Sequence, residues 1–369
     1  MNILCLDQFS ELGGAQRCLL DLLPALAGQG WGVHVAAPGS GELLARAAAM
    51  PAAVSTIRCG PYSSGRKTAL DMARFAVELP RLASGIRALV RDHRADLVYV
   101  NGPRLLPAAA LAIRRGTPLL FHSHSLLAGY ALRLAGWSVR HSRAAVVACC
   151  RFVARPLEPY AGGVTIVYNG VCVAHTPVST RDESPRLTIG VIGRISPEKG
   201  QTEFLRAARL LHHGLPGAHF LVCGAPLLSD AAAVRYAQQV RDLAAGLHVE
   251  FTGWQPDVSK TLAGLDLLVV PSTSVEATPR VILEAFAAGV PVLAYASGGI
   301  PEIVEHNVTG FLVEQRTPEA LAAAMHGALQ QPQRMRDVAA QARLKVSRDF
   351  TLGHYQQQML AAIEAAVLH

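Results

Sequence analysis

The stretch LDLLVVPSTSVEATPRVILEAFAAGVPVLAY, residues 265–295, decides the fold of this chain. It opens with the apolar run DLLVVP (266–271), passes through a helical pattern and closes with a second apolar run, VPVLAY (290–295). Two short apolar runs joined by a helical segment predict a β-α-β unit of a parallel sheet. The stretch also contains two carboxylates, Glu276 and Glu284, and the second lies in an otherwise apolar helical segment. A carboxylate in that position needs polar partners, which ligand hydroxyls would supply.

The same alternation of strand and helix patterns runs through both halves of the chain. We expect strands near 2–6, 32–36, 54–58, 96–100, 118–122, 144–148 and 164–168, and again near 186–193, 218–224, 248–253, 266–271 and 290–295. Helical patterns separate these runs, notably over 67–93, and close the chain at 317–330, 332–347 and 351–367. Such alternation predicts α/β domains, which bind ligands beyond the carboxyl ends of their strands.

Two domains are expected, because 369 residues exceed the size of one ordinary core. The segment AHTPVSTRDESPR (174–186) is polar, contains two prolines and has no periodicity, as is typical of a linker. We therefore predict an N-terminal domain over 1–173, a C-terminal domain over 187–350 and a final helix over 351–369. Each domain is predicted to be Rossmann-like, with a doubly wound parallel sheet, and the two are expected to face a central cleft.

Composition indicates a globular protein, since 51% of the residues are hydrophobic and no disordered or fibrous tract is present. No apolar run approaches the roughly 20 residues needed to span a bilayer. The opening MNILCLD reads as a strand without a basic region or cleavage site, so we expect no signal peptide. The seven cysteines lack metal-ligand spacing and fit buried thiols in a reducing compartment, which predicts a cytoplasmic location.

Positive charge is concentrated in the first half. Residues 1–170 contain 17 Arg and 1 Lys against 9 acids, a net charge of +9, and the remainder carries −2. Within this half, the segment 66–94 mixes Arg with apolar residues at helical spacing, which suits the surface of an anionic membrane. The alternative is an ordinary solvated helix docked on its sheet. Nucleic acid is not expected as a partner, because aromatic residues make up only 6% of the chain and no recognition module is present.

The loop GRISPEKG (193–200) follows the first strand of the second half. Gly193 lets the backbone turn, Arg194 and Lys199 supply two cations, and the next helix presents its N-terminus. Together these features predict a diphosphate site. The alternative is a glycine turn that carries two solvated cations.

The loop STSVEATPR (272–280) follows the strand that opens the quoted stretch. We expect Thr278 to be the N-cap of the next helix and Pro279 its first residue. Glu276 then precedes the helix, whose N-terminus offers a second site for phosphate oxygens. Alternatively, Glu276 is stabilised by the helix dipole alone and binds no ligand.

Two motifs of the first half also follow predicted strands. Gly13–Gly14 is a turn that lets the backbone approach a ligand before a helix begins at about Ala15. In FHSHS (121–125), His122 and His124 lack a third metal ligand, so a metal site is not expected. Either a neutral imidazole faces a sugar-sized ligand, or the histidines are buried and hydrogen-bonded.

Taken together, these motifs resemble the retaining GT-B glycosyltransferases of family 4, the group 1 transferases, over nearly the whole chain and in the family's order. The matching motifs are GGAQR (13–17), LLFHSHS (119–125), VYNGV (167–171), GRISPEKGQ (193–201), LVVPS (268–272), the two acids of E-x7-E, and GGIPEIV with TGFLV (298–313). The resemblance also implies that the final helix, 351–369, packs back on the first domain.

The resemblance implies a role for each matching residue. Arg194 and Lys199, after the turn at Gly193, would hold the diphosphate of a nucleotide sugar and stabilise the leaving group. Glu284 would bind the ribose, and Glu276 would contact hydroxyls of the transferred sugar. Donor contacts are also implied along the loop residues Ala277, Thr278, Pro279, Arg280 and Val281. His122 or His124 would help to position the sugar, and the Gly13–Gly14 loop would close against the donor.

The implied activity is retaining transfer of a hexose from a UDP- or GDP-sugar, with no metal or other cofactor. The acceptor would be a glycan or lipid-linked glycan of cell-envelope polysaccharide synthesis, at the inner face of the cytoplasmic membrane. The sequence departs from the family at Ala277-Thr278-Pro279, where Gly-Phe-Gly is frequent, at Gln16, where Glu is frequent, and at Tyr168, where Pro is frequent. The alternatives are an inactive GT-B subunit that binds nucleotide or a partner, and a nucleotide-sugar epimerase of the same fold.

Overall fold

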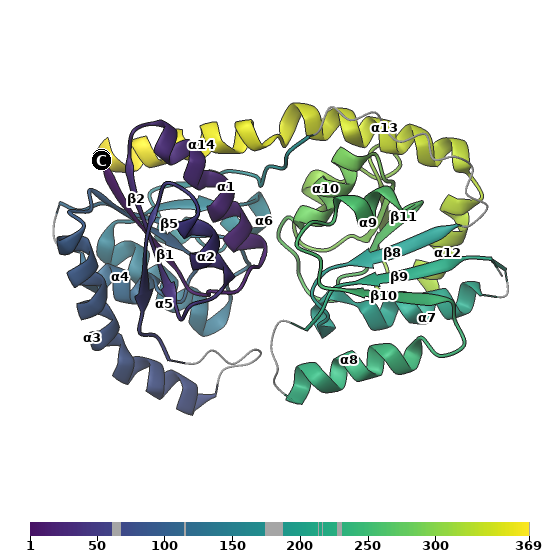
Figure 1. The fold of residues 1–369 in the computed structure, drawn as a ribbon, viewed down its shortest axis with the longest axis horizontal. Helices are drawn as coiled ribbons and strands as arrows, with labels where there is room; N and C mark the ends of the chain where they lie inside the picture. Colours follow the sequence, from purple (N-terminus) through teal and green to yellow (C-terminus); the bar gives the residue numbers. More distant parts are fainter. Residues whose placement is uncertain are drawn as a thin grey trace. The chain divides into compact units, whose positions relative to one another are not determined.

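The computed structural model describes residues 1–60, 68–113, 116–173, 187–212, 214–215, 217–226 and 231–368. The chain forms two compact units, one of Met1–Asn169 with Tyr355–His369 and one of Gly170–His354. The linker expected at 174–186 lies outside the described residues, as do the first two residues of the basic segment 66–94. Each unit is built around its own parallel sheet (Figure 1).

The sheet of the first unit has seven strands in the order β3-β2-β1-β4-β5-β6-β7. These strands are β1 (Asn2–Asp7), β2 (Gly32–Pro38), β3 (Ala53–Ile57), β4 (Leu97–Asn101), β5 (Leu119–Ser123), β6 (Ala145–Ala148) and β7 (Val164–Ile166). All of its pairings are parallel. The register pairs Asp7 with Asn101 and Asn101 with His122, so three polar residues stand at neighbouring positions at the carboxyl edge.

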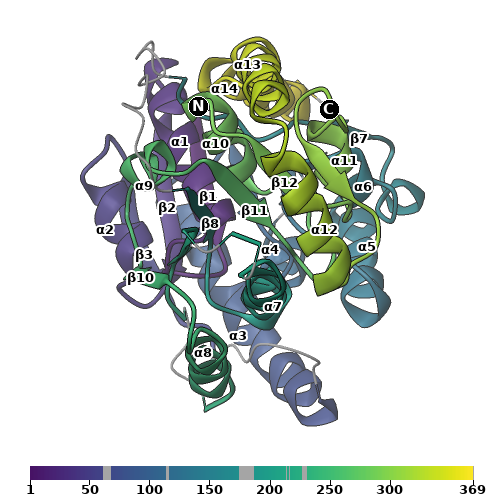
Figure 2. The same ribbon diagram turned by 90° about the vertical axis from the view of Figure 1, so that its right-hand side faces the viewer.

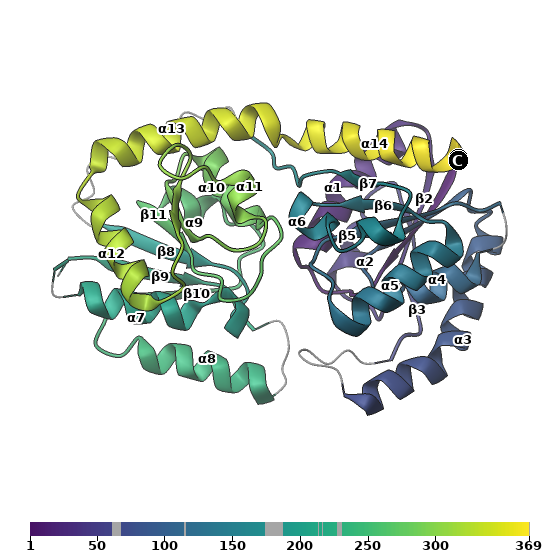
Figure 3. The same cartoon turned by 180° about the vertical axis from the view of Figure 1, so that it is seen from behind.

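Helices cover both faces of this sheet. They are α1 (Gly14–Gly28), α2 (Glu42–Ala48), α3 (Ala69–Asp92), α4 (Leu106–Ala112), α5 (Gly129–Ser142), α6 (Arg151–Ala154), the 3-10 turn η1 (Glu158–Tyr160) and α14 (Leu352–Leu368) from Tyr355 onward. The helices α3, α4 and α5 form a row on the face nearest the viewer in Figure 3. Alternate strand residues such as Leu4, Leu6 and Val98 pack against this row, as the two-residue period of a strand requires.

The final helix α14 packs against α1 within the first unit. The hydroxyl of the buried Tyr355 donates to the carbonyl of Cys18 at 3.0 Å, and the Gln356 amide donates to the carbonyl of Asp21 at 2.7 Å. These bonds hold the two helices together, although more than 300 residues separate them in sequence.

The sheet of the second unit has six strands in the order β10-β9-β8-β11-β12-β13. They are β8 (Thr188–Ile192), β9 (His219–Cys223), β10 (Val249–Gly253), β11 (Leu267–Val270), β12 (Val292–Tyr295) and β13 (Phe311–Val313). The strand β13 was not among the strands expected from the sequence. It extends the parallel sheet by pairing with β12.

The elements between these strands again cover both faces of the sheet. They are η2 (Pro197–Lys199), α7 (Gln201–Leu211), α8 (Ala231–Leu243), α9 (Ser259–Ala263), α10 (Arg280–Ala288), α11 (Ile300–Ile303), α12 (Pro318–Leu329) and α13 (Pro332–Asp349). The helices α7 and α12 lie side by side over one face of the sheet (Figure 2), and α10 packs against α9 and α13. Among the described residues, no helix combines the length and the apolar character required to cross a membrane.

Replacing Tyr355 tests how α14 stabilises the first unit. We expect Tyr355→Ala to lower the free energy of unfolding by about 3–5 kcal/mol, as for other large buried aromatics. Tyr355→Phe removes only the hydrogen bond and should cost about 1 kcal/mol. Gln357→Ala, an exposed control on the same helix, should change it by less than about 0.5 kcal/mol.

Urea unfolding followed by tryptophan fluorescence provides the measurement. The chain has three tryptophans, Trp31 and Trp137 in the first unit and Trp254 in the second, so a Trp254→Phe background reports on the first unit alone. If Tyr355→Ala unfolds at the same urea concentration as Gln357→Ala, α14 does not stabilise this unit.

Candidate functional site

Three loops of the second unit meet at the carboxyl edge of its sheet, because β8, β11 and β12 are neighbouring strands. The loop after β11 is joined to the loop after β8 by Thr273. Its hydroxyl donates to the carbonyl of Pro197 at 2.8 Å, and its backbone N–H donates to the carbonyl of Glu198 at 3.1 Å. The Gly299 N–H after β12 donates to the carbonyl of Glu276 at 2.9 Å. Backbone and side-chain bonds therefore fix the three loops relative to one another.

Two glycines allow this close approach. Gly200 has φ +71° and Gly298 has φ +58°, which is the left-handed region that glycine adopts without strain. A Cβ at position 200 would overlap the carbonyl oxygen of Pro271, and one at position 298 would overlap that of Glu276. Any other residue at either position would push two of the loops apart.

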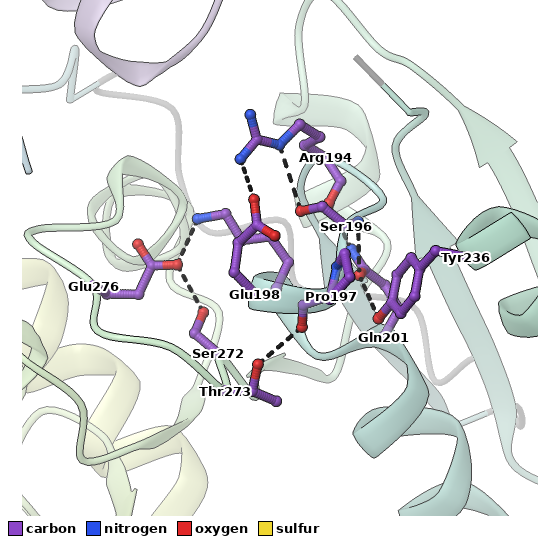
Figure 4. A network of polar contacts seen from close by, with 10 residues as sticks. Arg194, Ser196, Pro197, Glu198, Gln201, Tyr236, Ser272, Thr273 and Glu276 are labelled. Atoms are coloured by element: carbon purple, nitrogen blue, oxygen red, sulfur yellow. Dashed lines mark hydrogen bonds and ion pairs between the residues drawn. The ribbon is translucent and has the colours of Figure 1, made fainter. Parts of the chain in front are cut away.

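The central contact of the site is an ion pair between Lys199 and Glu276. Nζ of Lys199 lies 2.6 Å from Oε1 of Glu276. The same oxygen accepts a hydrogen bond from Ser272 Oγ at 2.9 Å (Figure 4). The two charged side chains are 29% and 14% exposed, so the pair is partly shielded from water but open to a ligand. It brings together the two residues for which the sequence predicts phosphate and sugar binding.

A second ion pair, between Arg194 and Glu198, lies on the loop after β8 (Figure 4). The Gln201 amide donates to the Arg194 carbonyl at 2.8 Å and so fixes the backbone of this loop. Burial alone would raise the pKa of Glu198. Hydrogen bonds from its own backbone N–H, Ser196 and Arg194, together with the charge of Arg194, hold that pKa below its usual range. Both cations predicted to bind phosphate therefore form ion pairs with carboxylates.

The helix α10 begins one residue later than expected. Pro279 is its N-cap, with the extended angles φ −60° and ψ 116°, and Arg280 is its first residue, so the prediction of Thr278 as the N-cap is wrong. The reason is that Pro279 holds an extended conformation. Thr278 is instead buried, at 5% exposure.

Glu284 lies on α10, one turn after Arg280. Its Oε1 is 3.7 Å from Nε of Arg280, and the side chains are 21% and 14% exposed. Four neighbours on the helix, Ile282, Leu283, Ala285 and Phe286, are fully buried. Glu284 is thus a half-buried carboxylate beside an arginine on an otherwise apolar helix. The other predicted donor contacts, Ala277, Val281 and Gly193, are also half-buried.

The first unit holds a polar network at the carboxyl edge of its own sheet. The Asp7 carboxylate accepts hydrogen bonds from the Asn101 amide at 2.5 Å and from the Gln16 amide at 2.8 Å. Oε1 of Gln16 in turn accepts the N–H of Gly13 at 3.1 Å, and Oδ1 of Asn101 lies 2.7 Å from Nε2 of His124. The network therefore connects the predicted glycine loop with one of the predicted histidines.

Asp7 is fully buried, and burial raises the pKa of its carboxyl to about 6. Hydrogen bonds from Asn101, Phe9, Gln16 and the backbone of Gln8 act in the opposite direction and limit the rise. The carboxyl is therefore mostly ionised at neutral pH and loses its charge in mildly acidic solution.

The two histidines differ in accessibility. His122 is fully buried, its Nδ1 lies 2.6 Å from the hydroxyl of Tyr99, and its Nε2 has no hydrogen-bond partner among the described residues. Burial and the neighbouring His124 hold the pKa of His122 well below its usual value, so its ring is neutral. His124 is only half-buried, with its ring centroid 3.9 Å from that of His122. Of the pair, His124 is the one that a ligand can reach.

The glycine loop differs from its expected form. The helix α1 begins at Gly14, one residue earlier than expected, and the N–H of Gly13 is bonded to Gln16. A Cβ at Gly14 would meet no atom within 4 Å, so this glycine borders open space. Gly14 remains the point at which a ligand can approach the backbone.

Sequence reasoning missed several residues of these sites. Ser272, Glu198, Asp7 and Asn101 were not predicted, although each follows or ends a strand at a carboxyl edge. A polar residue at the end of a buried strand is the signal that would have found Asp7 and Asn101. In the part of the chain that the structure describes, no three His, Cys, Asp or Glu side chains gather as a metal site requires.

Two family models match the chain, one in each half. The family model described as Glycosyltransferase Family 4 matches residues 12–175, and that described as Glycosyl transferases group 1 matches residues 177–345. The first match covers the glycine loop and the histidines, and the second covers the two ion pairs.

Curated relatives match part of the chain. A GDP-mannose-dependent α-(1-6)-phosphatidylinositol monomannoside mannosyltransferase of Mycobacterium tuberculosis is 34% identical over 38% of this chain and 37% of its own length. A D-inositol 3-phosphate glycosyltransferase of Mycolicibacterium paratuberculosis is 33% identical over 48% and 40%. The matched part of the chain spans about two fifths of the length of such relatives.

Solved structures match over the whole chain. HepE of Anabaena, in complex with UDP and glucose, superposes with a TM-score of 0.81 at 24% identity, over 99% of this chain and 100% of HepE. Sucrose-phosphate synthase of Thermosynechococcus elongatus superposes with a TM-score of 0.78 at 19% identity, over 99% of both chains. The folds therefore agree across both units, and the chain belongs to the GT-B glycosyltransferases of family 4.

Proposed function

We propose that the protein is a retaining, metal-independent glycosyltransferase that moves a hexose from a UDP- or GDP-sugar to a glycan or lipid-linked acceptor. The observation that supports this proposal is the Lys199–Glu276 pair, in which a cation contacts the carboxylate that we propose binds the sugar. Arg194 forms a second ion pair, with Glu198, on the loop that also carries Lys199.

The chemistry requires stabilisation of a leaving diphosphate. When the bond between the anomeric carbon and the phosphate oxygen breaks, its electron pair remains on the diphosphate. Lys199 and Arg194 are suited to meet that charge, because their carboxylate partners hold both cations at the carboxyl edge, where the diphosphate can compete for them. Charge-assisted bonds to phosphate contribute roughly 1.5–3 kcal/mol each.

The names of similar proteins support the donor and acceptor classes. HepE was crystallised with UDP and glucose, and the mycobacterial relative is named for GDP-mannose and a phosphatidylinositol mannoside. We propose a UDP- or GDP-linked donor on this basis. For the acceptor, we propose a molecule that is carried by a membrane lipid and used in cell-envelope polysaccharide synthesis.

A thermal-shift screen of UDP, GDP and ADP, followed by their sugars, tests the donor class. We expect one uridine or guanosine diphosphate to raise the melting temperature, because a ligand that binds only the folded protein stabilises it. The protein should then hydrolyse the sugar donor that contains this nucleotide slowly, or transfer its sugar to an acceptor. A nucleotide that binds while none of its sugars is hydrolysed or transferred would instead identify an inactive nucleotide-binding member.

Opposite substitutions in the central ion pair should have opposite effects on nucleotide binding. Lys199→Met removes a cation and leaves Glu276 to repel the diphosphate, so we expect affinity for the diphosphate to fall at least tenfold. Glu276→Gln releases Lys199 while keeping the shape of the side chain, so affinity should stay the same or rise. Turnover should nevertheless fall about a hundredfold or more, because the sugar loses its carboxylate. Calorimetry and initial rates provide the two measurements.

The pair Arg206–Glu203 on α7 is the matched control, with 2.9 Å between its charged atoms and side chains that are 47% and 14% exposed. Arg206→Met and Glu203→Gln remove the same charges from the same unit and should alter neither affinity nor turnover by more than about twofold. Equal losses of affinity in Lys199→Met and Glu276→Gln would contradict the division of roles between the two residues.

The contact with an anionic membrane expected from segment 66–94 is a further part of the proposal. On α3, Leu70 and Val77 are 59% and 74% exposed. They alternate along the helix with the exposed Arg74 and Arg81, and the spacing of four, three and four residues puts all four on one face. Apolar and cationic side chains on a single helix face support docking on an anionic lipid surface.

Sedimentation with phosphatidylglycerol vesicles tests this surface. We expect binding at low salt that is lost at about 0.5 M salt, where surface charges are screened. Arg74→Glu combined with Arg81→Glu should weaken low-salt binding at least tenfold, since each cation near the surface contributes about 1 kcal/mol. The control, Arg334→Glu with Arg336→Glu, reverses two exposed charges on α13 and should bind as the wild type does. No sedimentation of the wild type at low salt would exclude the membrane contact.

A further inference from the structure

The polar network of the first unit connects the Gly13–Gly14 turn with His124, which lie far apart in the sequence. The strands β1, β4 and β5 are neighbours in the sheet, and their register places Asp7 beside Asn101. Both side chains are fully buried. On one side the network reaches His124, and on the other it reaches the N–H of Gly13.

The orientation of the Asn101 amide follows from its partners. Its Nδ2 lies 2.5 Å from the Asp7 carboxylate and 3.1 Å from the carbonyl oxygen of Ala15. An ionised carboxylate and a carbonyl only accept hydrogen bonds, so the amide nitrogen must face them. Oδ1 of Asn101 therefore faces His124, 2.7 Å from its Nε2.

The tautomer of His124 follows in turn. A carboxamide oxygen has no proton to give, so the hydrogen bond between Asn101 and His124 exists only if Nε2 carries the proton. In the neutral ring, Nδ1 is then the basic nitrogen. A second partner often fixes a histidine tautomer in this way, and it determines what the other nitrogen offers to a ligand.

Gln16 transmits the same constraint to the glycine turn. Its Nε2 donates to Asp7 at 2.8 Å, which leaves its Oε1 to accept the N–H of Gly13 at 3.1 Å. A glutamate at position 16 would place a second carboxylate against a buried one, and two such charges repel strongly.

We infer that Asp7 and Asn101 are positioning residues that hold His124 in the Nε2-protonated tautomer and hold the Gly13–Gly14 turn in register with it. This inference deepens the proposed glycosyl transfer and rests on it for its effect on turnover. Nδ1 of His124 then presents a hydrogen-bond acceptor to a substrate hydroxyl. The raised pKa of Asp7, about 6, is consistent with this arrangement, because the carboxylate is ionised and purely accepting at neutral pH.

Nitrogen-15 NMR of the full-length protein, with labelled histidine rings, tests the tautomer directly. The resonances of His124 are assigned by their absence in His124→Gln. At pH 7.5 we expect a neutral ring with the proton on Nε2. A proton on Nδ1, or an even mixture of the two tautomers, would overturn the inference. Because this spectrum needs neither donor nor acceptor, it remains informative if the protein transfers no sugar.

The variant Asn101→Ala tests the consequence for turnover. We expect its His124 to lose the single tautomer and kcat to fall at least tenfold, with KM for the donor changed less than threefold. The control Ser138→Ala removes the hydrogen bond of another fully buried residue of the first unit, from Ser138 Oγ to the carbonyl of Leu134, and should change neither the tautomer nor kcat. If Asn101→Ala does not fold, Asn101→Ser replaces it with a smaller polar side chain.

The outcomes separate the two proposals. If a folded Asn101 variant keeps both the tautomer and the kcat of the wild type, the positioning role is wrong. If the wild type has the Nε2–H tautomer but hydrolyses and transfers no donor sugar, the proposed function fails while the placement of the proton stands.

Discussion

The ion pair between Lys199 and Glu276 is the interaction on which the candidate site depends. The two residues are 77 positions apart in sequence, and their 2.6 Å contact joins the loop after β8 to the loop after β11. Pairs of this exposure contribute little to stability, typically about 0–1 kcal/mol. Their value here is geometric, because each charge fixes the position of the other until a ligand with phosphate and hydroxyl groups competes for both.

The backbone around this pair holds the loops that carry the two charges close together. Thr273 ties one loop to another, and the close approach at Gly298 leaves no room for a side chain. The loops follow neighbouring strands of a parallel sheet, where such sheets commonly bind ligands. Rigid backbone and exchangeable side-chain charges together suit a site that must bind an anion, stabilise more charge during the reaction and then release it.

Much of the fold follows from the alternation of apolar runs and helical patterns, because that pattern depends on local residues only. The strand β13 was not predicted, and the start of α10 was misplaced because the backbone at Pro279 is extended, with ψ 116°. The site was harder to predict. The individual residues Lys199 and Glu276 were identified, but their contact depends on strand order, which no local pattern encodes. The sequence could not tell His122 from His124, because both are plausible ligand-facing residues at the end of a strand. The strand β5 ends at Ser123, so His122 is buried within it and His124 is accessible after it.

The buried carboxylate of Asp7 opposes folding of the first unit at neutral pH, because burial raises its pKa. A folded-state pKa of about 6 against an ordinary value of 3.8 means that Asp7 favours folding fully only below about pH 4. That contribution is lost as the pH rises through 6. At neutral pH the loss of folding stability amounts to about 3 kcal/mol. A buried amide network without the carboxylate would avoid this cost. Because an amide in place of Asp7 offers only one acceptor oxygen, it could not receive both the Gln16 and the Asn101 amides as firmly. The carboxylate is therefore best explained by the orientation it imposes on those two amides, and through them on Gly13 and His124.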